Sequence, residues 1–122
     1  ALTSLETSDL QKLGIQDTLS NQVVRLGRLA IEAGLDGLVA APTEVSRIRR
    51  HFGSSLLVIT PGIRPSGSPL NDQNRVATAA ASIKAGSDHL VIGRPITASS
   101  NPVFALKNIL ETIQTTDEQT EL

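Results

Sequence analysis

Gly93 and Arg94 stand directly after Val91 and Ile92, a short apolar run with the composition of a buried strand. A glycine at a strand end lets a ligand approach the backbone N–H groups, and the planar guanidinium beside it offers donors that match the oxygens of a phosphate. This pair therefore predicts a phosphate site. A structural arginine that pairs with a nearby carboxylate is the alternative, and the local sequence does not separate the two.

A second polar group follows the preceding apolar run, which ends at Thr60. Arg64 comes shortly after this run, and a long stretch rich in Pro, Gly, Ser and Asn (61–72) leads to Gln73. Long loops at the C-terminal ends of parallel strands often clamp ligands. Arg64 is expected at a strand end, and if it and Arg94 both contact one phosphate, each contact would be charge-assisted. Gln73 is placed to reach back across the loop, although a solvated amide is the simpler interpretation of that residue alone.

Other kinds of active site find little support. The chain has no cysteine, and neither His51 nor His89 has a second histidine at ligand spacing, so we predict no metal site. No Gly-x-Gly-x-x-Gly fingerprint, P-loop or Gly-x-Ser-x-Gly motif occurs. Asp36 and Asp88 precede strands, at the end of the sheet opposite the expected site, which favours a role in stability. The residues by themselves predict a phosphate-binding α/β protein and no particular reaction.

Three short apolar runs are the predicted strands: 38–41, 56–60 and 90–93. Their nearly continuous hydrophobicity is typical of parallel strands that are buried on both faces. Segments with helical periodicity lie between and after them, the last beginning with Asn101 as N-cap and Pro102 in the first turn. This alternation predicts an α/β fold with a parallel sheet and right-handed crossovers.

An internal repetition supports this architecture. The segment 32–39, Glu-Ala-Gly-Leu-Asp-Gly-Leu-Val, recurs at 84–91 as Lys-Ala-Gly-Ser-Asp-His-Leu-Val. In both copies a glycine, Gly34 or Gly86, stands where the end of a helix needs a positive φ, and a Leu-Val pair opens the next strand. We therefore expect two similar helix-to-strand joints in a sheet built from repeated βα units.

Composition argues against several classes of protein. The 122 residues carry 11 Lys plus Arg against 12 Asp plus Glu, so nucleic-acid binding is not expected. The only dense basic group, Arg47 with Arg49 and Arg50, is interpreted as a solvated helix face. Aromatic residues make up 2% of the chain, which leaves no stacking platform for a base. No apolar run approaches the ~20 residues of a membrane span and no signal-peptide pattern is present, so the cytoplasm is the expected location.

The hydrophobic fraction of 39% suits one globular domain, at 1–113, followed by a polar tail at 114–122. The chain begins at Ala1 and contains no methionine, which is unlike a natural translation start. It reads like a piece of a longer protein. N-terminal processing, or first residues outside the given sequence, are the alternatives.

Six blocks of the sequence form a recognisable set in a fixed order. They are Leu2-Thr3-Ser4, Gly34-Leu35-Asp36-Gly37-Leu38-Val39, Thr60-Pro61-Gly62-Ile63-Arg64-Pro65, Asp72-Gln73 with Arg75-Val76, Ala85-Gly86-Ser87-Asp88 and Ile92-Gly93-Arg94-Pro95-Ile96-Thr97. From Leu2 to about Ile113 the chain resembles the C-terminal half of orotidine 5'-phosphate decarboxylase of the bacterial type.

The resemblance implies the C-terminal half of a (β/α)8 TIM barrel, from the end of strand 5 through helix 8. It makes Thr3 the residue whose hydroxyl contacts the pyrimidine. It places Arg64 and Gln73 in a phosphate-gripping loop, and it assigns Gly93, through its N–H, and Arg94 to the rest of the phosphate site. That family works as a dimer without a cofactor and converts orotidine 5'-phosphate to UMP and CO2. The implied partners are orotidine 5'-phosphate or UMP, a second subunit, and the N-terminal half of the barrel.

Two differences stand beside the match. The chain has Ala40-Ala41-Pro42 where the family usually reads Cys-Ser-Pro, and Thr78-Ala79 where it usually has Thr-Pro. A larger difference is that no Asp-x-Lys-x-x-Asp pattern occurs. In the family a Lys and Asp cluster does the chemistry, with the lysine protonating the carbon that loses CO2. We therefore predict no catalytic residue in this chain and no activity for it alone.

Two other interpretations stay open. One is a non-catalytic half-barrel that self-associates to cover its open sheet edges. The other is a different phosphosugar enzyme of the barrel type, which would share the Gly-Arg phosphate site and reject the pyrimidine.

Overall fold

The computed structural model describes residues 3–68, 72 and 75–118, with side chains described as far as residue 115. In chain order its elements are α1 (Thr7–Lys12), α2 (Leu19–Glu32), β1 (Gly37–Val39), the 3-10 helix η1 (Pro42–Glu44), α3 (Val45–Phe52), β2 (Leu57–Thr60), α4 (Ala79–Ala85), β3 (His89–Leu90), α5 (Arg94–Thr97) and α6 (Pro102–Glu118). The predicted alternation of strands and helices is confirmed, and the fold is of the α/β class.

The three strands form one parallel sheet in the order β1-β2-β3. Ile59 is the central residue of the register, with Val39 of β1 on one side and His89 of β3 on the other. The strands are shorter than the apolar runs that predicted them. In β3 the regular pairing ends at Leu90, although the N–H of Val91 still donates to the carbonyl of Thr60 at 2.9 Å, because the chain soon turns into α5.

Only one face of the sheet is covered among the described residues. Val58 and Thr60 are fully buried, whereas Val39, Leu57 and Val91 are 55%, 45% and 53% exposed. Since side chains alternate between the two faces of a strand, the first pair lies under the helices and the other three lie on the opposite face. The expectation that the strands are buried on both faces is therefore wrong for this chain, because no described element packs against that second face.

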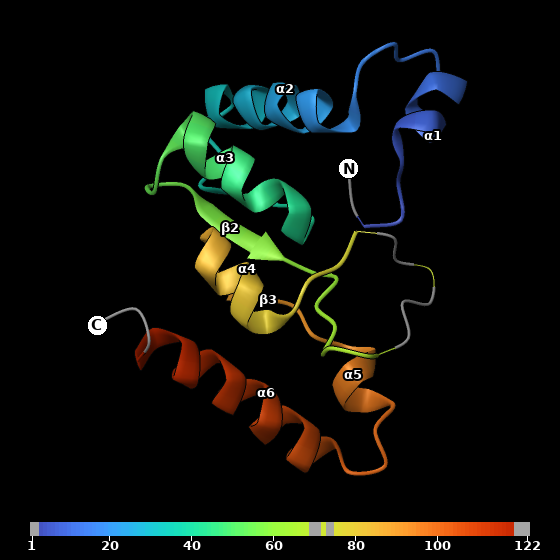
Figure 1. Cartoon of the computed structure of the whole chain (residues 1–122). Coiled ribbons are helices and arrows are strands. Elements are labelled where there is room, and N and C mark those ends of the chain that lie inside the picture. Colours follow the sequence, from blue (N-terminus) through green and yellow to red (C-terminus); the bar gives the residue numbers. More distant parts are fainter. Residues whose placement is uncertain (1–2, 69–71, 73–74, 119–122) are drawn as a thin grey trace.

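Two hydrophobic clusters lie between the helices and the sheet. The larger is formed by residues of α2, α3 and β2 and by the residues just after β1 and just before β2: Val23, Ala40, Val45, Ile48, Leu56 and Val58. The smaller joins the loop after β2 to α4 and α6 through Ile63, Ala79 and Ile109. Figure 1 shows α2 and α3 together at one end of this layer, and α4 and α6 at the other. The burial of these apolar side chains is the main term that holds the helices on the sheet.

The two predicted helix-to-strand joints are confirmed. Gly34 follows α2 with φ +85°, and Gly86 ends α4 with φ +110°, in the left-handed region that L side chains rarely adopt. The predicted start of α6 is confirmed as well, since the side chain of Asn101 accepts the N–H of Phe104 at 3.1 Å.

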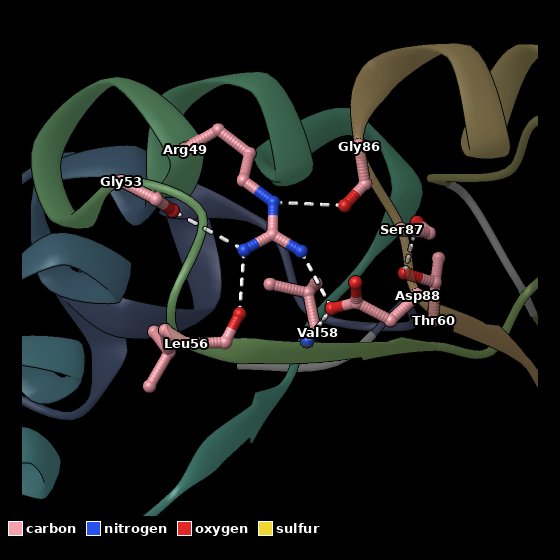
Figure 2. A network of polar contacts seen from close by, with 8 residues as sticks. All are labelled: Arg49, Gly53, Leu56, Val58, Thr60, Gly86, Ser87 and Asp88. Carbon is pink, nitrogen blue, oxygen red and sulfur yellow. Dashed lines mark hydrogen bonds and ion pairs between the residues drawn. The ribbon is translucent and has the colours of Figure 1, made fainter.

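Arg49 fastens the N-terminal ends of β2 and β3 (Figure 2). Its Nε donates to the carbonyl of Gly86 at 2.8 Å, its Nη1 to the carbonyls of Leu56 and Gly53 at 2.5 and 3.2 Å, and its Nη2 lies 2.5 Å from the carboxylate of Asp88. The guanidinium fork thus ties together the ends of α3 and α4 and the start of β2. The prediction that Arg49 belongs to a solvated helix face is wrong, because partners far away in the sequence bury it.

Asp88 completes this arrangement. Its carboxylate also accepts the N–H of Val58 at 2.7 Å, and beside it the hydroxyls of Thr60 and Ser87 lie 2.6 Å apart. The pKa of Asp88 is held below its ordinary value, first by the Val58 N–H and then by Arg49. The prediction that Asp88 serves stability is confirmed by these contacts.

Candidate functional site

The opposite end of the sheet holds the residues expected to bind phosphate. In Figure 1 the arrowhead of β2 points toward the loop that follows it and toward α5. The bridge between Ile63 and Ala77 joins the two ends of this loop, and the N–H of Arg64 donates to the carbonyl of Ala77 at 2.9 Å. Ligands of parallel α/β sheets bind at the carboxyl ends of the strands, and the chain carries its candidate residues there.

Gly93 leads directly into α5. Its carbonyl accepts the N–H groups of Ile96 and Thr97 at 2.9 and 3.0 Å, which fixes the turn. A Cβ added to Gly93 would meet no atom within 4 Å, so the space beside its backbone is open. The sequence predicted that a ligand approaches the backbone here, and this open space is compatible with such an approach.

Arg94 is the first residue of α5, and its side chain reaches the loop after β2. Its Nη2 lies 2.5 Å from Oδ1 of Asp72, and the two side chains are 47% and 71% exposed. The pKa of Asp72 is lowered, first by this hydrogen bond and also by the charges of Arg94 and Arg64. Arg94 is the arginine that contacts this carboxylate among the described residues. The pairing of Arg94 with a carboxylate, which the sequence left as an alternative, does occur in this structure.

Arg64 is held close to the main chain. The residue is only 6% exposed, and its Nη1 donates to the carbonyl of Ile63 at 2.9 Å. Its Nε is buried and has no hydrogen-bond partner among the described residues. A buried guanidinium nitrogen without an acceptor is costly, so an anion that reached this group would remove a penalty as well as add a contact.

Thr3 lies beneath the base of the same loop. It is 4% exposed, and its carbonyl accepts the N–H of Arg75 at 3.2 Å. Gly62 has φ +77°, and a Cβ at that position would overlap the Thr3 methyl group. The glycine of the Pro-Gly-Ile-Arg-Pro block is thus required by both backbone conformation and close packing. Gln73, the remaining candidate residue, lies outside the described residues.

The sequence interpretation missed an ion pair beside these residues. Glu44, in the 3-10 helix after β1, is 4% exposed, and its Oε1 lies 3.0 Å from Nη1 of Arg75. Burial lowers the pKa of Arg75, while Glu44 acts in the opposite direction. The available signal was an acidic residue just after an apolar run, at the edge where the other polar residues gather. In the described ranges no group of three or more His, Asp or Glu residues is arranged to hold a metal ion, and no helix is long and apolar enough to cross a membrane.

Known proteins match both the sequence and the fold. The sequence model of the family described as "Orotidine 5'-phosphate decarboxylase / HUMPS family" matches residues 1–109. A relative from Mannheimia succiniciproducens named orotidine 5'-phosphate decarboxylase is 53% identical over 108 residues, which are 88% of this chain and 46% of that protein. One of the same name from Geobacter metallireducens is 52% identical over 109 residues, 89% of this chain and 46% of that protein. The chain spans about half the length of the curated relatives it matches.

The fold resembles solved structures, one of which has the same name as these relatives. The orotidine 5'-phosphate decarboxylase of Lactobacillus acidophilus superimposes with a TM-score of 0.75 at 31% identity, covering 93% of this chain and 46% of that one. A conserved protein from Geobacillus kaustophilus described as uncharacterized gives a TM-score of 0.67 at 27% identity, covering 93% of this chain and 47% of the other.

Proposed function

Because this chain belongs to the orotidine 5'-phosphate decarboxylase / HUMPS family, we propose that it is the C-terminal half of an orotidine 5'-phosphate decarboxylase. In this role it supplies the phosphate grip, the loop-closure elements and part of the pyrimidine pocket, while the catalytic lysine and aspartates lie in the other half of the barrel. The enzyme would convert orotidine 5'-phosphate to UMP and CO2 in pyrimidine biosynthesis, as a dimer and without a cofactor.

One observation carries the phosphate-binding part of this proposal: the guanidinium of Arg94 lies 2.5 Å from the carboxylate of Asp72, in the loop that also carries Arg64. An anion is therefore already held at the carboxyl ends of the strands. A phosphodianion carries more charge and more acceptor oxygens than a carboxylate, and a guanidinium fork matches it well. The substrate's phosphate would take the place of the Asp72 carboxylate beside Arg94.

The expected contacts are few and charge-assisted. Each arginine–phosphate contact is worth about 1.5–3 kcal/mol, and the half-exposed Arg94 belongs at the lower end because water screens it. The N–H of Gly93 and the amide of Gln73 would add neutral hydrogen bonds. Thr3 would contact the pyrimidine through its hydroxyl. Binding energy from the phosphate, which does not react, would then organise the groups that do.

Isothermal titration of this chain with UMP and with uridine tests the phosphate site directly. We expect UMP to bind and uridine to bind far more weakly, and Arg94→Ala to remove most of the difference. Size-exclusion chromatography run in parallel addresses the self-associating half-barrel. A dimer that is indifferent to UMP, and that Arg94→Ala leaves unchanged, would favour that structural interpretation and contradict ours.

If the chain belongs instead to a different phosphosugar enzyme of the barrel type, titrations should give a different order of affinities. Such a protein would hold ribose 5-phosphate as tightly as UMP, because it would recognise the phosphate and not the base. An orotidine 5'-phosphate decarboxylase assembled with its other half should prefer UMP.

A further inference from the structure

Glu44 and Arg75 form the most deeply buried ion pair among the described residues. The side chains are 5% and 14% exposed, and Oε1 of Glu44 lies 3.0 Å from Nη1 of Arg75. The same oxygen accepts the hydroxyl of Ser20 at 3.0 Å, while Oε2 is buried without a hydrogen-bond partner in the described part of the chain. Removing both charges from water is costly, and such a pair often contributes little net stability. This cost favours a role in fixing geometry over a role in stabilising the fold.

The pair connects two segments that are distant in the sequence. Glu44 ends η1, directly after β1, and is joined to the beginning of α2 through Ser20. Arg75 lies at the C-terminal base of the loop after β2, where its N–H donates to the carbonyl of Thr3 at 3.2 Å. Arg75 is thus attached by its side chain to η1 and by its main chain to the segment of Thr3.

The segment that begins at Arg75 also contacts Arg64, one of the residues expected to bind phosphate. Two residues after Arg75, Ala77 accepts the N–H of Arg64 at 2.9 Å and donates to the carbonyl of Gly62 at 3.4 Å. A shift of Arg75 would therefore move Ala77 and, through the bridge between Ala77 and Ile63, the segment that carries Arg64. Glu44 is joined to this segment through the side chain of Arg75, so any effect it has on a phosphate is indirect.

We propose that Glu44 and Arg75 are a positioning pair, in which Glu44 fixes Arg75 and thereby sets the place of Arg64 at the phosphate site. This inference rests on the proposed function and deepens it. Neither residue is expected to touch the reacting atoms. The expected effect is on binding of the phosphate, because Arg64 is the phosphate candidate whose N–H is held by Ala77, two residues after Arg75.

The test uses an enzyme reassembled from this chain and the part of the Mannheimia succiniciproducens relative that it does not match. The variants are Glu44→Gln, which keeps the shape and can still accept from Ser20, and Arg75→Lys, which keeps the charge. The matched control is Asp88→Asn, which breaks the Arg49 ion pair at the opposite ends of the strands. The readouts are KM and kcat for orotidine 5'-phosphate, the inhibition constants of inorganic phosphate and of uridine, and the thermal midpoint.

For Glu44→Gln we expect KM and the inhibition constant of inorganic phosphate to rise by about 10- to 100-fold, the loss typical of a small misplacement of a binding group. The kcat should change much less, and inhibition by uridine should stay as it is. Arg75→Lys should give the same pattern to a smaller degree, and it serves as the test if Glu44→Gln does not fold. Asp88→Asn should lower the thermal midpoint and leave KM, kcat and both inhibition constants unchanged.

Two results would overturn the inference in distinguishable ways. A Glu44→Gln enzyme with unchanged KM and unchanged phosphate inhibition, but a lowered thermal midpoint, would show a merely structural pair while the proposed function stands. A wild-type reassembled barrel that binds neither inorganic phosphate nor orotidine 5'-phosphate would overturn the proposed function and this inference together.

Discussion

Arg94 and Asp72 are joined by an ion pair of 2.5 Å that connects the beginning of α5 to the loop after β2. Both side chains are largely exposed, so the pair adds little to the stability of the fold. Its interest is chemical, because a guanidinium at the carboxyl ends of the strands already holds one anionic group. We propose that the substrate's phosphate takes the place of this group. The first two predictions concern this relationship.

Arg94→Ala should weaken UMP binding by roughly tenfold, because the loss of this half-exposed, charge-assisted contact is worth about 1.5 kcal/mol. Titration calorimetry at constant ionic strength measures the change. Arg50→Ala, at an exposed position on α3, removes the same charge away from the site and should leave binding unaltered. Equal losses for the two variants would mean that only net charge matters and that Arg94 holds no phosphate.

Asp72→Asn should strengthen binding of UMP and of inorganic phosphate. The native carboxylate competes for Arg94 and repels a dianion that approaches the same place, and an amide of equal size does neither. The gain should shrink as salt is added, because the groups are exposed to solvent. Weaker phosphate binding by this variant would indicate that the Asp72 charge supports the site instead of competing with the ligand.

Arg49→Ala should destabilise the fold by about 2–3 kcal/mol, since it leaves the carbonyls of Gly86 and Leu56 and the carboxylate of Asp88 without their donor. Urea unfolding followed by circular dichroism measures the difference. Arg50→Ala, one position further along α3, should fall within about 0.5 kcal/mol of the parent chain. A loss as small as that for Arg49→Ala would contradict the structural role assigned to this side chain.

The lowered pKa of Asp88 predicts how the stability of the fold changes as the pH falls. Its pKa lies below the ordinary value, chiefly because its carboxylate accepts the Val58 N–H. The native state then binds this proton more weakly than the unfolded chain does. The contribution of Asp88 to the free energy of unfolding is therefore complete above the unfolded-state pKa of about 3.9, and it is lost as the pH falls through and below that value. Asp88→Asn should therefore be less stable at neutral pH and should lose less stability on acidification. A carboxyl titration by NMR that gives Asp88 an ordinary or raised pKa would contradict this.

The sequence predicted those features that depend on neighbouring residues. The start of α6 follows from Asn101 and Pro102, and the two joints follow from the positive φ that Gly34 and Gly86 adopt. Hydrophobic runs located the three strands of the described residues, because a buried strand must be apolar wherever it lies. These signals are local, and each requires only a few consecutive residues.

Features that depend on long-range contacts were missed. Arg49 is indistinguishable in the sequence from the exposed Arg50, and its contacts are with Gly86 and Asp88, 37 and 39 positions away. Glu44 pairs with Arg75, which lies 31 positions away in the sequence. The exposed face of the sheet was also not predicted. An apolar run indicates that both faces of a strand are suited to burial, but it does not indicate whether this chain contains the element that covers each face.

The most direct measurement is CO2 release from orotidine 5'-phosphate after this chain is mixed with the part of the Mannheimia succiniciproducens relative that it does not match. We predict that neither part alone releases CO2, that the mixture does, and that Arg94→Ala in this chain raises the KM of the mixture for orotidine 5'-phosphate. A barrel that demonstrably assembles from the two parts and yet releases no CO2 would contradict the assignment of this chain to an orotidine 5'-phosphate decarboxylase.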